Sequence, residues 1–149
     1  MKIVKLKNKN WEIIREHAKS CFPEECTGIF ECKKINNKEI TITNIFVCKN
    51  VSKTKKYESM ISKRDMKKLR PVMASGIKKG LVYGVYHSHP NTGTLELSDQ
   101  DMFWAKFRKR FQLQIIVGIK KTKDILRTRR IFWQFSNSRW SEWAFRSLR

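Results

Sequence analysis

The sequence predicts a mixed α/β layer structure, and three observations support that fold class. Apolar residues recur at helical spacing in some segments and alternate with polar residues in others. These segments follow one another in the order helix, hairpin, helix, strand, helix, strands. No linker, repeat or low-complexity segment divides the 149 residues, a length that can bury a core, so we expect one domain over residues 1–149.

The first half of the chain predicts two helices around a hairpin. Residues 10–22 place apolar side chains such as Ile14 and Ala18 at helical spacing, and Pro23 ends that helix. Residues 26–34 and 40–49 read as strands on either side of the turn "NNKE". Residues 62–80 predict the second helix, which ends near the glycines at 76 and 80. His17 lies in the first helix, where we interpret it as a surface or packing histidine.

The second half predicts strands around a third helix. Residues 81–89 form a β-rich run whose alternation places His87 and His89 on one face. Residues 98–111 predict a helix with Ser98 as its N-cap. Residues 113–121 and 125–136 read as two further strands, and residues 139–149 as a short helix.

Composition and charge narrow the class of protein. No stretch approaches the ~20 apolar residues that span a bilayer, and the start lacks the apolar run of a signal peptide. We therefore expect a cytoplasmic protein with no membrane partner. The 33 Lys and Arg against 13 Asp and Glu give a net charge of +20, which attracts acidic proteins or nucleic acid. The basic residues are scattered and no nucleic-acid-binding motif occurs, so nucleic acid would bind only weakly and non-specifically.

Four cysteines lie in the first third of the chain, at positions 21, 26, 32 and 48. Their spacing matches no paired C-x-x-C zinc site, and nothing at the start of the chain indicates secretion and disulfides. Cys21, Cys26 and Cys32 are interleaved with apolar residues. We interpret them as buried thiols, with a cysteine metal site as the weaker alternative.

The stretch "GVYHSHPNTGTLELSDQD" (84–101) concentrates residue types that bind metals. His87 and His89 lie two residues apart on a strand end and point the same way, roughly 6.5–7 Å apart along the backbone. Both could therefore reach one zinc ion at about 2.0–2.1 Å. Asp101 lies in the first turn of the next helix, and the short loop from Pro90 brings it back to the strand end. Two histidines and one carboxylate leave a fourth position for water, as in catalytic zinc sites.

Each of these features also has an explanation without catalysis. Two histidines in H-x-H can simply lie at a strand edge, and Ser98-x-x-Asp101 is a sound capping box. Their occurrence together, joined by "HP" and a short polar loop, favours the metal site.

The motif "HSHP", seven residues and then "SDQD" resembles the H-[ST]-H-P-x(n)-S-x-x-D signature of the JAMM (MPN-plus) zinc metalloproteases. Members of that family also carry a glutamate well upstream, after a first helix, in a P-x-E-x-x-G-like segment. The segment "FPEECTGIF" matches it through Pro23, Glu25 and Gly28, so Glu25 corresponds rather than Glu24. The order of the elements is similar too, and the resemblance therefore covers most of the chain.

This resemblance implies a single MPN-like domain, with a mixed, curved β-sheet flanked by helices, and assigns roles to five residues. His87, His89 and Asp101 would hold Zn2+ with a water in the remaining position. Glu25 would accept the proton of that water as a general base and later deliver it to the leaving amine. Ser98 would donate a hydrogen bond to the developing oxyanion, a role compatible with capping.

The loop before the aspartate departs from the family pattern. Eleven residues (90–100) separate His89 from Asp101, one more than family members usually have. We expect the extra residue to bulge the loop "NTGTLEL", which makes Asp99 a second candidate ligand. The spacing Ser98-x-x-Asp101 favours Asp101.

Similar proteins cleave ubiquitin, or ubiquitin-like proteins in bacteria and archaea, from conjugates or precursors. The resemblance therefore implies a zinc-dependent peptidase or isopeptidase, deubiquitinase-like, whose substrate is the C-terminal tail of a ubiquitin-like protein or its conjugate. E1- or E2-like conjugation proteins would be further partners. Two alternatives stay open: a non-catalytic MPN scaffold, against which the five site residues argue, and a basic nucleic-acid-associated protein resembling RadC-type members.

Overall fold

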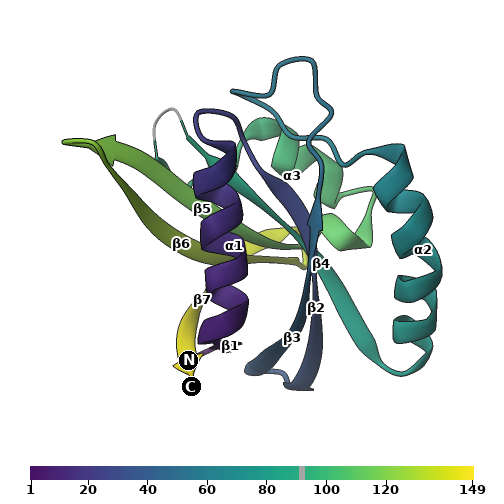
Figure 1. Cartoon of the computed structure of the whole chain (residues 1–149). Coiled ribbons are helices and arrows are strands. Elements are labelled where there is room, and N and C mark those ends of the chain that lie inside the picture. The colour runs from purple at the N-terminus through teal and green to yellow at the C-terminus, as the bar shows by residue number, and fades with distance from the viewer. Residues whose placement is uncertain (91–92) are drawn as a thin grey trace.

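The protein is described from a computed structural model, which covers residues 1–90 and 93–149. The elements in chain order are β1 (Ile3–Lys7), α1 (Asn8–Cys21), β2 (Thr27–Asn36), β3 (Glu39–Cys48), α2 (Lys63–Lys78), β4 (Leu81–His89), α3 (Asp99–Ala105), the 3-10 turn η1 (Lys109–Phe111), β5 (Leu113–Thr122), β6 (Ile125–Ser136) and β7 (Arg139–Leu148). Within these residues the seven strands form a closed barrel in the order β1-β3-β2-β4-β5-β6-β7 (Figure 1).

The barrel closes through strand β1. The strands β3, β2 and β4 pair antiparallel in that order, as do β5, β6 and β7, and the two groups meet where β4 and β5 run parallel. Strand β1 then pairs parallel with β3 on one side and with β7 on the other. Its five residues, "IVKLK", alternate between partly exposed and buried positions, so even this lysine-containing segment turns Val4 and Leu6 into the core.

The predicted α/β fold, a mixed curved sheet flanked by helices, is wrong. The strands close into a barrel that contains most of the regular structure, and the three helices are short. The main cause lies in residues 139–149, which form strand β7 and not a helix. Trp140 and Trp143 are three residues apart and suggest a helical face, but the core takes up Trp143 and Phe145, two residues apart. A strand at this place can pair with β1, which a helix cannot.

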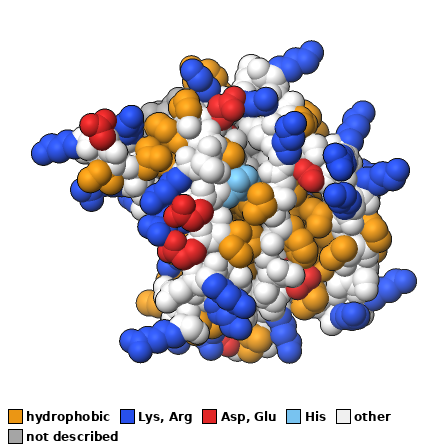
Figure 2. All heavy atoms as spheres, viewed as in Figure 1, with side chains coloured by type: hydrophobic (Ala, Val, Ile, Leu, Met, Phe, Trp, Pro, Cys, Tyr) orange, Lys and Arg blue, Asp and Glu red, His pale blue; other side chains and the backbone are white. Residues whose placement is uncertain are grey.

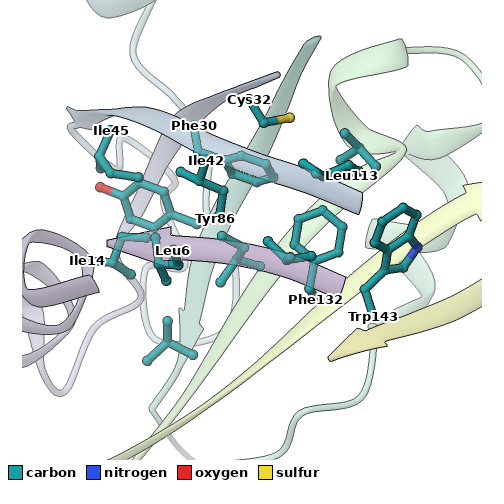
Figure 3. Packing of buried hydrophobic residues seen from close by; sticks show 14 of the residues in the cluster. Leu6, Ile14, Phe30, Cys32, Ile42, Ile45, Tyr86, Leu113, Phe132 and Trp143 are labelled. Atoms are coloured by element: carbon teal, nitrogen blue, oxygen red, sulfur yellow. The ribbon is translucent and has the colours of Figure 1, made fainter. Parts of the chain in front are cut away.

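The larger core lies on the α1 side of the sheet. Helix α1 contributes Ile14 and Ala18, which pack with residues from all seven strands of the described chain. Figure 3 shows this packing, with Tyr86 of β4 near Ile14 and with Phe132 and Trp143 at the other end. Because Tyr86 is fully buried, its ring fixes how β4 sits against α1.

The smaller core lies on the opposite side of β2 and β4, under α2 (Figure 1). Met66 of α2 packs there with Ile29, Tyr83 and Val85. Helix α2 approaches β4 closely, since a Cβ added at Gly76 would overlap the hydroxyl of Tyr83. Strand β4 therefore has a packed side chain on each face along most of its length.

Alternation along β4 decides which residues reach the α2 side. Tyr86 belongs to the core on the α1 side, whereas Tyr83 and Val85 belong to the core on the α2 side. By the same period of two, His87 continues the row of Tyr83 and Val85 beyond the end of the smaller core. The fold thus delivers a histidine to the place where the sheet ends.

Helix α3 begins after Ser98, the expected N-cap, but it ends at Ala105 rather than at 111. The remaining predicted residues form a short irregular segment and η1, which lies against β4 and β5. None of the helices in the described residues is both long enough and apolar enough to cross a membrane.

Candidate metal centre

Three side chains from the end of β4 and the start of α3 meet at one point. The Nε2 atom of His87 lies 3.0 Å from Nε2 of His89 and 3.2 Å from Oδ2 of Asp101. The third pair, His89 Nε2 and Asp101 Oδ2, is 3.9 Å apart. The structure thus brings together the three residues that the sequence singles out as ligands, as a group that could hold a metal ion.

The donor atoms fit a zinc ion in chemistry and in spacing. A tetrahedral ion with bonds of about 2.0 Å needs donors about 3.3 Å apart. The three observed separations, 3.0, 3.2 and 3.9 Å, bracket that value. Two imidazole nitrogens and one carboxylate oxygen are also the donor set of catalytic zinc sites. Small shifts of rotamer would suffice to bring all three into contact with one ion.

The ring of His89 is oriented by a backbone carbonyl. Its Nδ1 lies 3.1 Å from the carbonyl oxygen of Thr94, which can only accept a hydrogen bond. Nδ1 must therefore carry the hydrogen, which leaves the lone pair of Nε2 directed at His87 and Asp101. Such an outer hydrogen bond is the usual way in which a protein prepares a histidine ligand.

The carboxylate of Asp101 is fixed by the start of its own helix. The backbone N–H of Ser98 donates to Oδ2 of Asp101 over 3.0 Å, and the Ser98 hydroxyl accepts from the N–H of Asp101 over 3.1 Å. This is a complete capping box, so the capping function and the ligand position coexist in one residue. Asp99, the other candidate, is exposed in the same turn and outside the group. The bulge expected in "NTGTLEL" involves residues 91–92, which lie outside the described residues.

Burial and charge set the protonation of these groups. Burial opposes the protonated form of His87, but the carboxylate of Asp101 outweighs it and raises the pKa of His87. Burial and the nearby charge of His87 lower the pKa of His89 to about 4. Although burial opposes ionisation of Asp101, its contacts with His87 and Ser98 hold its pKa below the usual range. Near neutral pH the site therefore offers a neutral His89 and an ionised Asp101 to a cation.

Glu25 lies between α1 and β2 and faces the same pocket. Its backbone N–H donates to the carbonyl of Lys55 over 2.7 Å, and Nδ2 of Asn50 donates to its carbonyl over 3.0 Å. The residue is only 6% exposed, whereas Glu24 next to it is exposed. Burial is the main cause that raises the pKa of Glu25 to about 7, with a contribution from the charge of Asp101. This is the pKa range of a general base that works near neutral pH.

Gly28 of the glutamate motif has a structural reason. A Cβ at Gly28 would overlap the ring of Tyr86, so only glycine allows β2 to pass over that buried ring. The Tyr86 hydroxyl in turn lies 2.8 Å from Nδ1 of His17. His17 therefore packs against the core and stands apart from the metal-ligand group, as its place in the first helix indicates.

The cysteines contribute nothing to this site in the described part of the chain. Cys26, Cys32 and Cys48 are buried and Cys21 is half-buried, and all four are free thiols. Burial raises the pKa of the three buried thiols to about 12, so they stay protonated and unreactive. Residues 1–90 and 93–149 contain no second group of ligands around them.

A pocket of about 260 Å³ opens over the donor atoms. It is lined by all five residues that the sequence singles out, namely Glu25, His87, His89, Ser98 and Asp101. Figure 2 shows a histidine side chain at the centre of this face, with hydrophobic side chains beside it. Other residues that line the pocket, notably Glu58, Arg108 and Arg110, were not among the predicted site residues. The basic and aromatic run "KFRKRF" (106–111) is the signal that could have drawn attention to the two arginines.

Comparison with known proteins identifies the family. No significant match was found among curated proteins. Among solved structures, the chain is similar to the solution structure of protein DSY2949 from Desulfitobacterium hafniense. The similarity has a TM-score of 0.68 and 18% sequence identity, and it covers 97% of this chain and 92% of that one. At that identity the likeness concerns the fold alone. Residues 7–132 match the family described as prokaryotic homologs of the JAB domain, and the chain therefore belongs to this prokaryotic JAB-domain family.

Proposed function

We propose that this protein is a zinc-dependent peptidase or isopeptidase of the JAMM type. The observation that carries the proposal is the convergence of a buried glutamate and three zinc-type donors on one pocket. JAB-domain proteins include isopeptidases and also non-catalytic members, so membership of the family does not decide between them. The intact set of Glu25, His87, His89 and Asp101 favours catalysis, because a scaffold has no need of a buried glutamate in the same pocket as a group of zinc-type donors.

Glu25 supplies the base in this mechanism. Since its pKa is raised to about 7, part of the population is ionised and can take a proton from the attacking water. The resulting carboxylic acid then delivers that proton to the leaving amine, which completes the proton transfer without a second acid. The backbone bonds to Lys55 and Asn50 hold the residue in place for both steps.

Zinc held by His87, His89 and Asp101 would polarise the scissile carbonyl and make the attacking water more acidic. Ser98 stabilises the oxyanion in our proposal. Its hydroxyl oxygen accepts the N–H of Asp101, and this bond does not use the hydroxyl hydrogen, which can point into the pocket that Ser98 lines.

The substrate class that we propose is the C-terminal tail of a ubiquitin-like protein, in a conjugate or a precursor. An extended tail suits a pocket at the end of a strand, where the reacting carbonyl must reach donors on β4 and α3. The net charge of +20 would attract an acidic partner, whether the ubiquitin-like protein, its target or an E1- or E2-like protein.

The test compares Glu25→Gln with Glu24→Gln on a ubiquitin-like fusion protein. Glutamine keeps the shape of Glu25 but cannot take up a proton, so the turnover should fall by about 10²- to 10⁴-fold. Zinc content should stay near one per chain, since Glu25 is not a ligand. Glu24→Gln is the matched control and should cleave like wild type, because Glu24 is exposed. Full activity of both variants would contradict the proposed mechanism.

A further inference from the structure

A second charged cluster lies in the same pocket as the metal-ligand group. Arg108 and Arg110 line this pocket and also the adjoining groove beside Tyr83. Burial lowers the pKa of Arg110, and the like charges of Arg108 and Arg70 lower it further. We call Arg108 and Arg110 the arginine cluster.

The cluster has no acidic partner in the described chain. No ion pair formed within residues 1–90 and 93–149 involves Arg108 or Arg110. The Nε atom of Arg110 is buried there without a hydrogen-bond acceptor, and its guanidinium lies 5.1 Å from the ring centre of Phe111. A buried donor without an acceptor is unfavourable, and so is the repulsion of Arg110 by the like charge of Arg108. These two costs indicate a site that is shaped for an anion from another molecule.

The position of the cluster relative to the metal centre follows from strand β4. His87, Val85 and Tyr83 point to one face, about 7 Å apart from one to the next. Val85 shares the pocket of Arg110 with His87, and Tyr83 shares the adjoining groove. Arg110 lines both spaces, and η1, to which it belongs, lies against β4. The row from His87 to Tyr83 spans roughly 13 Å and an extended peptide rises about 3.3 Å per residue, so a peptide that follows this row from the metal ligands passes along it in roughly two to four residues.

We propose that the arginine cluster binds a carboxylate of the substrate, the side chain of an Asp or Glu two to four residues from the scissile bond. This inference rests on the proposed function and adds a sequence preference to it. A guanidinium fork pairs with a carboxylate through two parallel hydrogen bonds, and stacking on Phe111 holds the fork of Arg110 in plane. Glu25 and Glu58 line the same pocket, and they would repel this carboxylate if the peptide bound in the reverse direction.

The test uses glycine peptides that carry a hydroxamate, a group that binds zinc and so fixes the register. One series has the hydroxamate at the C-terminus and the other at the N-terminus, and each member has a single Glu or Gln one to six residues away. Binding is measured by fluorescence anisotropy to the zinc-loaded protein near 0.15 M salt. In at least one series, Glu should bind about tenfold more tightly than Gln at a position two to four residues from the hydroxamate.

Two variants and a matched control assign that preference. Arg110→Gln and Arg108→Gln should each reduce the ratio of the affinities for the Glu and Gln peptides towards one. Both variants should leave the affinity for the Gln peptides unchanged. Arg127→Gln removes the same charge from an exposed position on β6 and should keep the tenfold preference. Inorganic phosphate serves as a free-anion competitor and should displace the Glu peptides only at much higher concentration.

The outcomes separate this inference from the proposed function. Binding of all hydroxamates without a Glu preference would overturn the carboxylate site alone and leave the metal site standing. A Glu preference that survives Arg110→Gln and Arg108→Gln would also overturn the carboxylate site. So would phosphate that binds more tightly than the Glu peptides. Failure of every hydroxamate to bind would overturn the metal site and, with it, this inference.

Discussion

Among the three donor residues, His87 has the central position. Its Nε2 is the only donor within 3.2 Å of both others, and its side chain is the least exposed of the three. His89 owes its orientation to the Thr94 carbonyl, and Asp101 owes its position to the helix cap. His89 and Asp101 are thus oriented by backbone groups outside the ligand set, so loss of one ligand leaves these contacts of the others in place.

Replacement of a histidine ligand should therefore abolish zinc binding without loss of the fold. His87→Ala and His89→Ala each leave two protein ligands, which hold zinc poorly. We expect about one zinc per chain in wild type and less than a tenth of that in each variant, measured by elemental analysis after dialysis. His17→Ala is the matched control and should retain the metal, because His17 bonds to Tyr86 instead. Undiminished zinc in the His87→Ala/His89→Ala double variant would mean that the ion binds elsewhere.

A second pair of variants separates the two candidate aspartates. Asp101→Asn keeps a side-chain oxygen for the cap but removes the negative charge that offsets the charge of a bound cation. We expect it to lose most of the zinc and the activity. Asp99→Asn should change both by less than about twofold, because Asp99 is exposed and outside the donor group. The reverse result would show that the longer loop shifts the ligand by two residues.

The three metal ligands could be predicted because their spacing is local: His87 and His89 are two residues apart on one strand, and Asp101 follows in the first turn of the next helix. Glu25 was predicted only through the resemblance to the JAMM motif, and it reaches the site because β2 pairs with β4, with Thr27 opposite His87. Arg108 and Arg110 could not be predicted in the same way. They meet the pocket only because α3 ends at Ala105 and η1 folds back onto β4, which no periodicity in the sequence indicates.

At the scale of single elements, the helix starts were easier to predict than the ends. Ser98 caps α3 as expected, and Ser62 caps α2. Each serine hydroxyl accepts a hydrogen bond from the backbone N–H three residues later, so the cap depends on nearby residues only. The end of α3 and the nature of β7 depend on what packs against them. The aromatic residues Phe103, Phe107 and Phe111 follow a helical period. Phe103 and Phe107 are nevertheless exposed, so no burial of an apolar helix face extends α3 beyond Ala105.

The start of helix α2 offers a test of a cap that depends on nearby residues. Oδ2 of Asp65 accepts bonds from the N–H of Lys49 and the hydroxyl of Ser62, over 2.8 and 2.7 Å. Asp65→Ala should lower the free energy of unfolding by about 1–2 kcal/mol at pH 7, measured by urea titration. Glu16→Ala, at an exposed position on helix α1, is the control and should change it by less than about 0.5 kcal/mol.

The difference in the free energy of unfolding between wild type and Asp65→Ala depends on pH, and its sign can be stated. The hydrogen bond from Lys49 and that from Ser62 lower the pKa of Asp65 in the folded protein. The stabilisation is therefore fully present above the unfolded pKa of about 3.9 and is lost as the pH falls through the lower, folded pKa. The gap between wild type and Asp65→Ala should be constant from pH 7 to about 5 and should shrink below 4. A gap that widens in acid would contradict this account.

At the scale of the whole molecule, closure of the barrel joins the two ends of the chain. Strand β1 at the start of the chain pairs in parallel with β7 at its end, from Ile3 opposite Ala144 to Lys7 opposite Leu148. Ile14 of α1 and Trp143 of β7 belong to the same buried cluster. We propose on this basis that residues 1–149 unfold as one domain, in which the pocket cannot persist without the closing strand.

Trp143→Ala tests this cooperativity most directly. Trp143 is only 1% exposed, it packs against Phe132 with ring centres 6.0 Å apart, and its Nε1 donates to Oε1 of Gln134 over 2.9 Å. Its truncation leaves a large cavity and an unpaired amide oxygen, so we expect a loss of about 3–5 kcal/mol in the free energy of unfolding. Trp140→Ala, on the same strand but only half-buried, should cost roughly 1–2 kcal/mol, and Trp143→Phe offers a milder variant if Trp143→Ala does not fold.

The measurement is a urea titration followed both by far-UV circular dichroism and by release of zinc from the loaded protein. If the chain is one cooperative unit, circular dichroism and zinc release give the same midpoint as each other in wild type, and again in Trp143→Phe. Both midpoints then shift by the same amount from wild type to the variant. A variant in which circular dichroism reports early loss of β-structure while zinc stays bound would show that β7 opens on its own. The pocket between β4 and α3 would then be a separately stable part of the fold, and the proposal of one domain would fail.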